Sequence, residues 1–395
     1  MQSEQHRLIS TVKNKLNEDI HTVVLYSDDE LKILIHKYVL LALQDPFVSS
    51  AYIVRIINTI FNSMRKFDIL QDLIEDDAIN EIMVNGHTSI FIEKHHVLHK
   101  TPLTFDSSET LYNIIQTMVS GINRSVNESE PIVDARLKDG SRIHVVLPPI
   151  ALNGPILTIR KFPRKPLTMT DIIQKGSLTE EAAAFLNENV RNKKNIFISG
   201  GTASGKTTFL NILSSFIPKE ERIVTIEDSA ELNLHGAQNI VRLEARNNNS
   251  EGRGEISIRD LIKAALRMRP DRIVVGEVRG AEAIDMLQAM NTGHSGSIST
   301  GHANSSRDML SRLETMVLLG ANIPLLAISR QIASAIDILV HLCRTKDMQR
   351  HVQEISSVDG INKDGQIILT SIFLQNDETK TLERIKSRAR ESEIQ

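Results

Sequence analysis

Hydrophobic and polar positions alternate with two different periods along the 395 residues, and the changes of period divide the chain into regions. From about Asp28 to Lys66 the apolar positions recur at helical spacing. Ser27 is a start signal for the first run, and Asp45 and Pro46 interrupt the pattern. This predicts two amphipathic helices that pack against each other. We therefore expect residues 1–67 to form a helical N-terminal extension.

After Asp68 the pattern changes to short apolar runs that are separated by turn residues. The runs INEIMVNG, SIFIEK and VLHK predict strands, and DSSETLYNIIQTMVSGIN predicts a helix. The segment DARLKDGSRIHVVLPP has the pattern of a hairpin with Asp139 and Gly140 in its turn, and PILTIRKF predicts one more strand. The sequence thus predicts a small α+β N-terminal domain over residues 68–163.

Two prolines, Pro163 and Pro166, mark the next boundary, and we expect a linker over residues 164–175. From there the strand and helix patterns alternate, which predicts an α/β domain with a parallel sheet over residues 176–375. Its last runs, RHVQEISSV and GQIILTSIF, have the pattern of strands. The charged residues 376–395 are expected to be a solvated helix or a disordered tail.

Charge and composition exclude several classes of protein. Lys and Arg number 46 and Asp and Glu 49, a formal net charge of -3, so general nucleic-acid binding is not expected. The one cysteine, Cys343, excludes a disulfide framework and a zinc site of the CxxC type. The N-terminus has no apolar signal-peptide core, and no run reaches the length of a membrane span. A cytoplasmic protein is therefore expected, with any membrane association peripheral.

The strongest chemical signal is GGTASGKT at positions 200–207, which fits the pattern G-x-x-x-x-G-K-[ST]. An apolar strand pattern precedes it and a helix pattern follows, as a phosphate-binding P-loop requires. The glycines let backbone N–H groups point inward, and the helix N-terminus adds partial positive charge. We expect ATP to bind to residues Gly200, Gly201, Thr202, Ala203, Ser204, Gly205, Lys206, Thr207 and Thr208. Lys206 would reach the β- and γ-phosphates, and the Thr207 hydroxyl would bind Mg²⁺.

Acidic side chains end two predicted strands of the same domain. Glu277 follows the apolar run IVV, and Gly276 stands where a Walker B aspartate usually does. Glu227 and Asp228 end the run IVTI. Because ligands bind at the carboxyl ends of strands in open α/β sheets, Glu277 and Glu227 are candidates for water activation or for holding Mg²⁺ through water, and Asp228 is a candidate for binding the nucleotide. The sequence leaves open whether Glu277 or Glu227 is the base.

Two histidines lie in the stretch TGHSGSISTGHAN. A metal site fits His294 and His302 poorly, since no cysteine or carboxylate lies near them in sequence. We instead expect both to sense the nucleotide phosphates, with His302 in the catalytic group.

These motifs, in this order, resemble those of the type II/type IV secretion ATPase superfamily: Walker A, Asp box, a Walker B ending in Gly-Glu, and His box. Further sequence segments are similar to those of ATPases in the CpaF/TadA branch of Tad pilus assembly. They include INEIMVNG, TIEDSAELNL and LIKAALRMRPDRIVVGEVRGAEAIDMLQAMNTGHSGS. The resemblance covers about Asp68 to Phe373. It implies a RecA-like C-terminal domain and a cytoplasmic, ring-shaped homohexamer. That ring would act on a polytopic platform protein at the inner face of the inner membrane.

The resemblance also implies arginines that approach the phosphates from the N-terminal domain. Arg142 in DGSRIHVV and Arg160 in LTIRKF match those positions, and Arg279 in GEVRG is a further candidate. Pilus-extension and type II relatives usually carry a four-cysteine zinc module, which this chain cannot form. Two alternatives stay open: a conjugation-associated ATPase, and a RecA-like nucleic-acid motor. The latter is weakened by an aromatic content of 4% and the absence of Trp.

Overall fold

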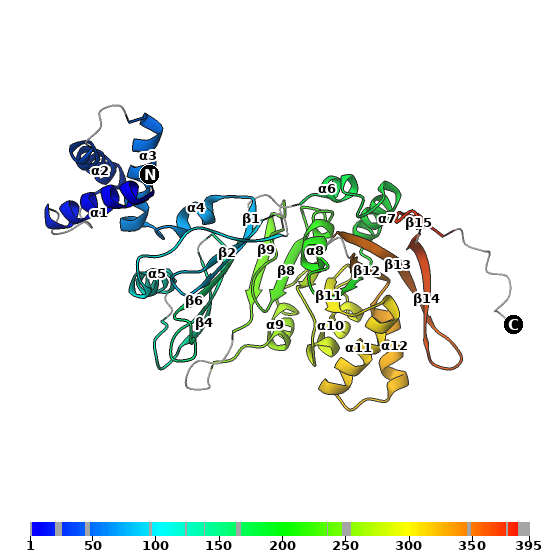
Figure 1. Ribbon diagram of the computed structural model, residues 1–395. Helices are drawn as coiled ribbons and strands as arrows, with labels where there is room; N and C mark the ends of the chain where they lie inside the picture. The colour runs from blue at the N-terminus through cyan, green and yellow to red at the C-terminus, as the bar shows by residue number, and fades with distance from the viewer. Residues whose placement is uncertain are drawn as a thin grey trace. The chain divides into compact units, whose positions relative to one another are not determined.

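The computed structural model divides the chain into two compact units, Met1–Lys165 and Pro166–Gln395 (Figure 1). It describes residues 2–19, 26–43, 48–94, 97–122, 125–137, 139–162, 167–234, 236–246, 254–345, 349–376 and 378–385. Pro163, Pro166 and residues 386–395 of the expected tail lie outside these ranges. Over the described ranges, no helix has both the length and the apolar character needed to cross a bilayer.

The first unit begins with three helices: α1 (Gln2–Asp19), α2 (Asp28–Ala42) and α3 (Ser50–Arg65). Ser27 and Glu30 form a capping box that starts α2, because each side chain accepts the backbone N–H of the other residue. The two helices predicted here are confirmed. Helix α1 lies within the predicted helical extension but was not predicted as a separate helix, although its Val12 and Leu16 are fully buried in the core shared with α2 and α3.

The rest of the first unit is an antiparallel sheet with the strand order β3-β2-β1-β6-β5-β4. Its core is formed by the inward side chains of the strands and by α5, with Leu111 and Ile115 fully buried. All six predicted strands and the predicted helix are confirmed. The elements are α4 (Leu70–Glu75), β1 (Ile79–Asn85), β2 (Ile90–Lys94), β3 (Val97–Lys100), α5 (Ser108–Ser120), β4 (Ile132–Arg136), β5 (Arg142–Val146) and β6 (Ile156–Arg160).

The second unit is built on a nine-stranded sheet with the order β15-β14-β13-β12-β7-β11-β10-β8-β9. The six strands from β12 to β9 in this order run parallel, as predicted, while β13, β14 and β15 add an antiparallel extension. The strands are β7 (Ile196–Gly200), β8 (Arg222–Glu227), β9 (Asn239–Glu244), β10 (Arg272–Val275), β11 (Ile298–His302), β12 (Ile338–Arg344), β13 (Arg350–Ile361), β14 (Ile367–Gln375) and β15 (Leu382–Arg384).

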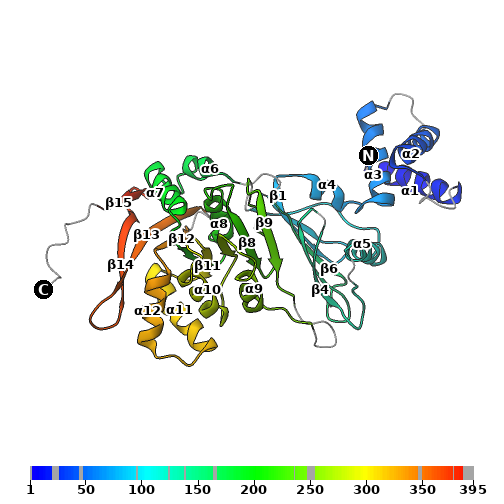
Figure 2. The ribbon, with the colours of Figure 1, turned by 180° about the vertical axis from the view of Figure 1, so that it is seen from behind.

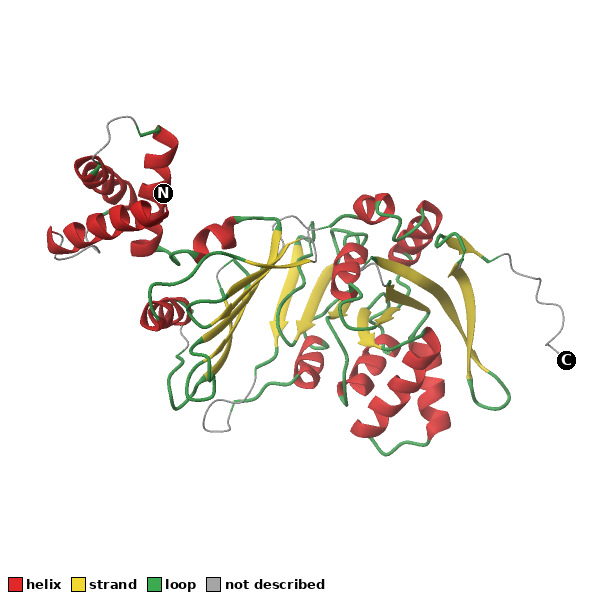
Figure 3. Cartoon of the chain, in the orientation of Figure 1, coloured by secondary structure: helices red, strands yellow, loops and turns green. Residues whose placement is uncertain are grey.

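Helices cover both faces of the parallel part of this sheet (Figures 2 and 3). Strand β7 shows the division, since Ile196 and Ile198 pack with α7 and α8 on one face and Phe197 packs with α10 and α11 on the other. A strand buried on both faces has no polar alternation, which explains its continuous apolar run. The helices are α6 (Met169–Gln174), α7 (Glu180–Arg191), α8 (Lys206–Ser214), α9 (Ile258–Ala265), α10 (Glu282–Asn291), α11 (Ser306–Gly320) and α12 (Leu325–Ala335).

Two boundary predictions were wrong. Residues 164–175, expected as a linker, contain helix α6, whose Thr168 and Asp171 form a capping box and whose Ile172 is buried in the core with α7. The expected solvated tail begins with strand β15, which pairs with β14 and buries Leu382. In both cases an apolar residue inside a polar segment packs into the core of the second unit.

Candidate nucleotide-binding and catalytic site

The loop between β7 and α8 has the backbone of a phosphate-binding site. Gly205 is the N-cap of α8 with φ +95°, a conformation that favours glycine, and it has no side chain with which to cap the helix. The first N–H groups of α8 are therefore left for an anion at the helix N-terminus. Ala203 also has a positive φ, of 60°. Thr207 and Thr208 are the second and third residues of the helix, beside the loop.

Lys206 lies inside this loop and is 8% exposed. Its Nζ donates to the carbonyl oxygens of Gly200 and Gly201, both at 3.2 Å, and lies 3.3 Å from Nδ1 of His302. Burial lowers the pKa of Lys206, and the nearby Glu277 carboxylate opposes that shift. A buried ammonium held by neutral acceptors is well placed to exchange them for phosphate oxygens.

Glu277 follows β10 and lies between His302 and Arg279. Its Oε1 lies 2.8 Å from Nε2 of His302, and its Oε2 lies 2.8 Å from Nη2 of Arg279. Arg279 also reaches Asp228, with Nη1 and Oδ2 3.4 Å apart. The contacts form one chain in the order Lys206, His302, Glu277, Arg279, Asp228. The structure thus brings together most of the residues that the sequence singled out on this domain.

His302 has the proton arrangement that this chain of contacts requires. Burial lowers its pKa, with Lys206 and Arg279 adding to the shift and Glu277 opposing it. A neutral imidazole has one acceptor and one donor nitrogen. With Nδ1 accepting from Lys206, the proton is on Nε2, which lies 2.8 Å from Oε1 of Glu277. His302 therefore joins the phosphate-binding lysine to the carboxylate.

Glu227 lies at the end of β8 but is turned away from these contacts. It is 3% exposed, and its Oε2 accepts the backbone N–H groups of Glu231 at 2.7 Å and Leu232 at 2.8 Å. A Cβ at Gly276 would lie 3.0 Å from Cγ of Glu227. The Glu227 side chain thus takes the space that a Walker B aspartate would need, which explains the glycine at position 276.

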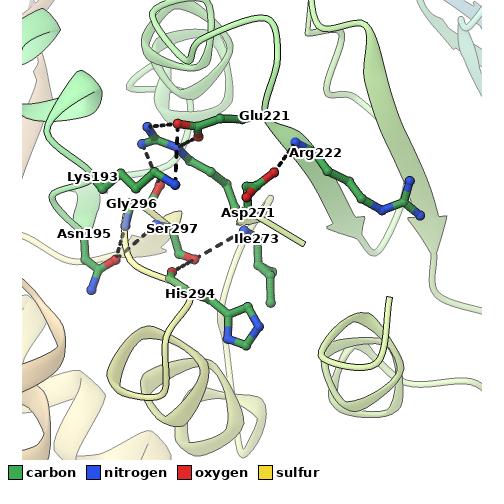
Figure 4. A network of polar contacts seen from close by, with 10 residues as sticks. Lys193, Asn195, Glu221, Arg222, Asp271, Ile273, His294, Gly296 and Ser297 are labelled. Atoms are coloured by element: carbon green, nitrogen blue, oxygen red, sulfur yellow. Dashed lines mark hydrogen bonds and ion pairs between the residues drawn. The ribbon is translucent and has the colours of Figure 1, made fainter. Parts of the chain in front are cut away.

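His294 lies at the end of the parallel strands that is away from the P-loop. Our prediction that it contacts phosphate was therefore wrong for the P-loop of its own chain. Strand β11 runs parallel to β7 and pairs His302 with Gly200, whereas His294 precedes the strand. A five-residue strand spans about 15 Å. Figure 4 shows the His294 ring pointing away from Glu221, while the His294 carbonyl accepts the Ser297 hydroxyl at 2.7 Å.

Arg142 and Arg160 belong to the first unit, where they are direct neighbours on adjacent strands. Arg136 of β4 lies opposite Arg142 and extends the row. The three alternate with core residues such as Ile143 and Ile159, so they share the sheet face opposite the core. Like charges directly opposite each other destabilise a sheet. The structure thus places three cations side by side on one sheet face, where Arg136 also donates to the Gly140 carbonyl at 3.2 Å. The sequence reasoning missed Arg136.

The sequence reasoning also missed Arg350, the first residue of β13. Its Nε donates to the carbonyl of Ala203 in the P-loop at 3.1 Å, and its Cδ lies 3.1 Å from where a Cβ on Gly205 would be. The antiparallel extension of the sheet thus touches the outside of the phosphate loop. Residues 203 and 350 are too far apart in sequence for any local pattern to reveal this contact.

Residues 63–390 match the family described as "Type II/IV secretion system protein". The chain belongs to this family. Together with its Walker A loop, that membership makes the chain a nucleotide-binding ATPase. The match spans both units of the structure, from the end of α3 to beyond β15.

Named relatives of this secretion ATPase come from transfer and secretion systems. It is 32% identical over 293 residues to the conjugal transfer protein TrbB of Rhizobium radiobacter, covering 73% of this chain and 86% of the relative. It is 35% identical over 310 residues to the type IV secretion system protein PtlH of Bordetella pertussis, covering 72% and 91%.

The fold of the secretion ATPase is also found in the crystal structure of the pilus retraction motor PilT with bound ADP. The two chains are 18% identical, the likeness covers 82% of this chain and 83% of that chain, and the TM-score is 0.54. This supports the predicted α/β fold with an additional N-terminal domain.

Proposed function

We propose that this chain is the ATP-hydrolysing motor of a type IV secretion or conjugal transfer machine. The observation that carries the proposal is the contact chain from Lys206 through His302 to Glu277, because it joins a phosphate-binding cation to a carboxylate at the end of a buried strand. The relatives TrbB and PtlH support the choice of machine.

In the proposed reaction the nucleotide phosphates bind at the N-terminus of α8. Lys206 exchanges the carbonyls of Gly200 and Gly201 for phosphate oxygens, and residues 201–205 supply backbone N–H groups. The Thr207 hydroxyl fits an Mg²⁺ ion, and Glu277 or Glu227 would hold its water ligands. That ion would neutralise charge on the β- and γ-phosphates.

Glu277 is the proposed base, since it is the carboxylate in contact with His302 and Arg279. It would accept the proton of the attacking water, a role worth about 10²–10⁴ in rate. His302 would couple binding of the γ-phosphate at Lys206 to the position of Glu277, because its ring contacts both Lys206 and that carboxylate. Glu227 has the supporting role of fixing the loop that carries Asp228, through its bonds to Glu231 and Leu232.

The working form in this proposal is a homohexameric ring at the inner face of the membrane, where it drives a polytopic membrane protein. The arginine row of Arg136, Arg142 and Arg160 would supply charge to the phosphates. The Tad pilus branch is a second candidate, favoured by the similarity of segments such as INEIMVNG and TIEDSAELNL, while the absence of a four-cysteine module fits both this branch and a conjugation-type ATPase.

The Lys206→Ala variant tests this function. We expect it to fold, to give the same light-scattering mass as the wild type, and to lose ATP turnover and substrate transfer in the parent cell. Turnover near the wild-type rate would remove the proposal. A monomer with full activity in ATP and Mg²⁺ would contradict the ring. Salt-sensitive stimulation by single-stranded DNA would favour a nucleic-acid motor instead.

A further inference from the structure

The backbone of the P-loop accepts a hydrogen bond from a strand that is distant in sequence. Arg350 is the first residue of β13, and its Nε donates to the carbonyl oxygen of Ala203 at 3.1 Å. The Cδ of the same side chain packs over Gly205, since a Cβ on that glycine would lie 3.1 Å from it. Arg350 therefore contacts the residues on both sides of Ser204.

This hydrogen bond also sets the direction of a backbone N–H group. A planar trans peptide points its C=O and its N–H in opposite directions. The Ala203 carbonyl is turned to Arg350, so the N–H of Ser204 is turned to the other side, where it donates to the Gly201 carbonyl at 3.3 Å. Lys206 Nζ donates to the same carbonyl at 3.2 Å. The Ser204 N–H thus shares its acceptor with the lysine to which we assign phosphate binding.

The conformation of this peptide depends on its surroundings. Ala203 has a φ of 60°, which residues other than glycine rarely adopt and which persists where neighbouring groups hold it. The side chain of Ser204 is buried, and its hydroxyl has no hydrogen-bond partner within the part of the chain that the structure describes. The Ser204 hydroxyl therefore does not fix the loop. The contact observed at the Ala203 carbonyl is the one from Arg350.

The start of β13 is itself fixed, so that Arg350 reaches the loop from a firm base. The two residues after Arg350 contact the turn that follows α6. Nδ1 of His351 lies 3.2 Å from the carbonyl oxygen of Gly176, and the N–H of Val352 donates to the carbonyl of Ser177 at 3.0 Å. Both His351 and Val352 are buried.

Strand β12 lies between β13 and the strand that enters the P-loop. Leu342 of β12 pairs in register with Gly200 of β7. In the preceding pair of residues, Nδ1 of His341 is 2.8 Å from the hydroxyl oxygen of Ser199, and both residues are buried. The distance between β13 and the P-loop is therefore set by a packed strand.

We propose that Arg350 is a positioning residue of the phosphate loop: by holding the Ala203 carbonyl, it turns the Ser204 N–H toward bound phosphate. The inference rests on the proposed nucleotide site. Arg350 acts through the backbone and does not need to touch the nucleotide. Because the contact is made to bound substrate before the reaction, it acts on affinity and KM more than on kcat.

Two variants of the full chain keep the length of the side chain and differ in one donor. In Arg350→Gln the amide nitrogen takes the position of Nε and can still donate to Ala203, whereas Arg350→Met places a methyl group there. Both remove the guanidinium, so every other contact of that group is lost equally. We expect the Kd for ADP to be about fivefold higher in Arg350→Met than in Arg350→Gln, within the range for one net hydrogen bond. Equal Kd values for the two variants overturn the proposal.

Inorganic pyrophosphate is the second probe, because it has phosphate groups and neither base nor ribose. Its Kd, measured from the rise in melting temperature, should differ between the two variants by the same factor as the Kd for ADP. A difference that is found with ADP alone would place the effect at the base or the ribose and would contradict the proposal. KM for ATP should follow the Kd, while kcat should be nearly equal in the two variants.

Arg344→Met is the matched control. Arg344 is the last residue of β12 and the register partner of Arg350, and its side chain is exposed. We expect this variant to keep the wild-type Kd for ADP and for pyrophosphate. A loss equal to that of Arg350→Met would show that positive charge at this end of the sheet sets the affinity, and it would overturn the positioning role.

The Lys206→Ala variant keeps this inference separate from the proposed function. Wild-type affinity and turnover in Lys206→Ala would remove the proposed nucleotide site, and the positioning role with it. Loss of turnover in Lys206→Ala, together with equal Kd values in Arg350→Gln and Arg350→Met, would overturn the positioning role alone.

Discussion

At the ends of β8 and β10, the side chain of Glu227 fills the space next to Gly276 that a side chain at position 276 would need. A Cβ on residue 276 would lie 3.0 Å from Cγ of Glu227, which is closer than nearly all real contacts of this kind. A side chain at position 276 therefore requires the side chain of Glu227 to shift. In this chain Glu227 is present, and it uses its Oε2 to hold the loop at Glu231 and Leu232.

Replacing Gly276 by aspartate should displace Glu227. We expect Gly276→Asp to be destabilised by about 1–3 kcal/mol through overpacking, with additional like-charge repulsion, and to lose turnover. Removing the competing side chain in Gly276→Asp with Glu227→Ala should recover part of that stability. The measurement is chemical denaturation of the single and double variants. Gly280→Ala is the control, because its Cβ would meet only the far end of the Glu282 side chain. Additive losses would show that the two sites do not share space.

The arginine row gives a prediction in which stability and activity separate. Arg142→Gln removes the middle charge of three but keeps a polar amide that can still hydrogen-bond, so we expect the melting temperature to change little. We expect kcat for ATP to fall at least about tenfold, since arginines of this kind are worth more in phosphoryl transfer. His144→Gln, two residues along the same face of β5, should leave kcat unchanged. Wild-type turnover in Arg142→Gln would show that the arginine row does not take part in the nucleotide site.

The buried His341 predicts a pH dependence of stability. Burial holds its pKa below the ordinary value of 6.5, against the opposing effects of Glu354 and Asp308. The unfolded chain therefore takes up a proton at a pH where the folded chain does not. Stability that is fully present above about pH 6.5 is lost as the pH falls through the folded pKa. One such proton contributes at most about 1.4 kcal/mol per pH unit.

Unfolding in urea at about pH 7.5 and pH 5.5 measures this effect. The wild type should lose more stability between the two pH values than His341→Gln does. His302 also has a lowered pKa, so His302→Gln should remove a separate part of the slope. Equal slopes for the wild type and His341→Gln would show that His341 does not resist protonation.

The sequence was sufficient wherever the signal is local. The P-loop is contiguous, and its strand and helix follow from the residues on either side. The two histidines show that a local sequence pattern does not give the direction of a strand in the sheet. His294 and His302 are separated by strand β11, and only the direction of that strand decides which one reaches the P-loop. The rule that ligands bind at the carboxyl ends of parallel strands would have favoured His302.

Other site features depend on contacts between distant segments. Arg350 reaches the loop at Ala203, and His341 meets Ser199, because β12 lies beside β7 and β13 lies beside β12. Strand order in a sheet cannot be read from periodicity, which is the same for every buried strand. Helix α1 was missed for a related reason, since its sequence alone is polar and, among its side chains that the structure describes, Val12 and Leu16 are the ones fully buried against its neighbours.

Single-turnover hydrolysis by Glu277→Gln and Glu227→Gln, with nucleotide affinity measured separately, tests the central claim most directly. Both changes keep the volume of the side chain and remove its charge. We predict that Glu277→Gln binds ATP and hydrolyses it at least about a hundredfold more slowly. Glu227→Gln should lose less, because its carboxylate holds a loop. If Glu277→Gln keeps most of its chemical step while Glu227→Gln loses it, the assignment of the base is contradicted.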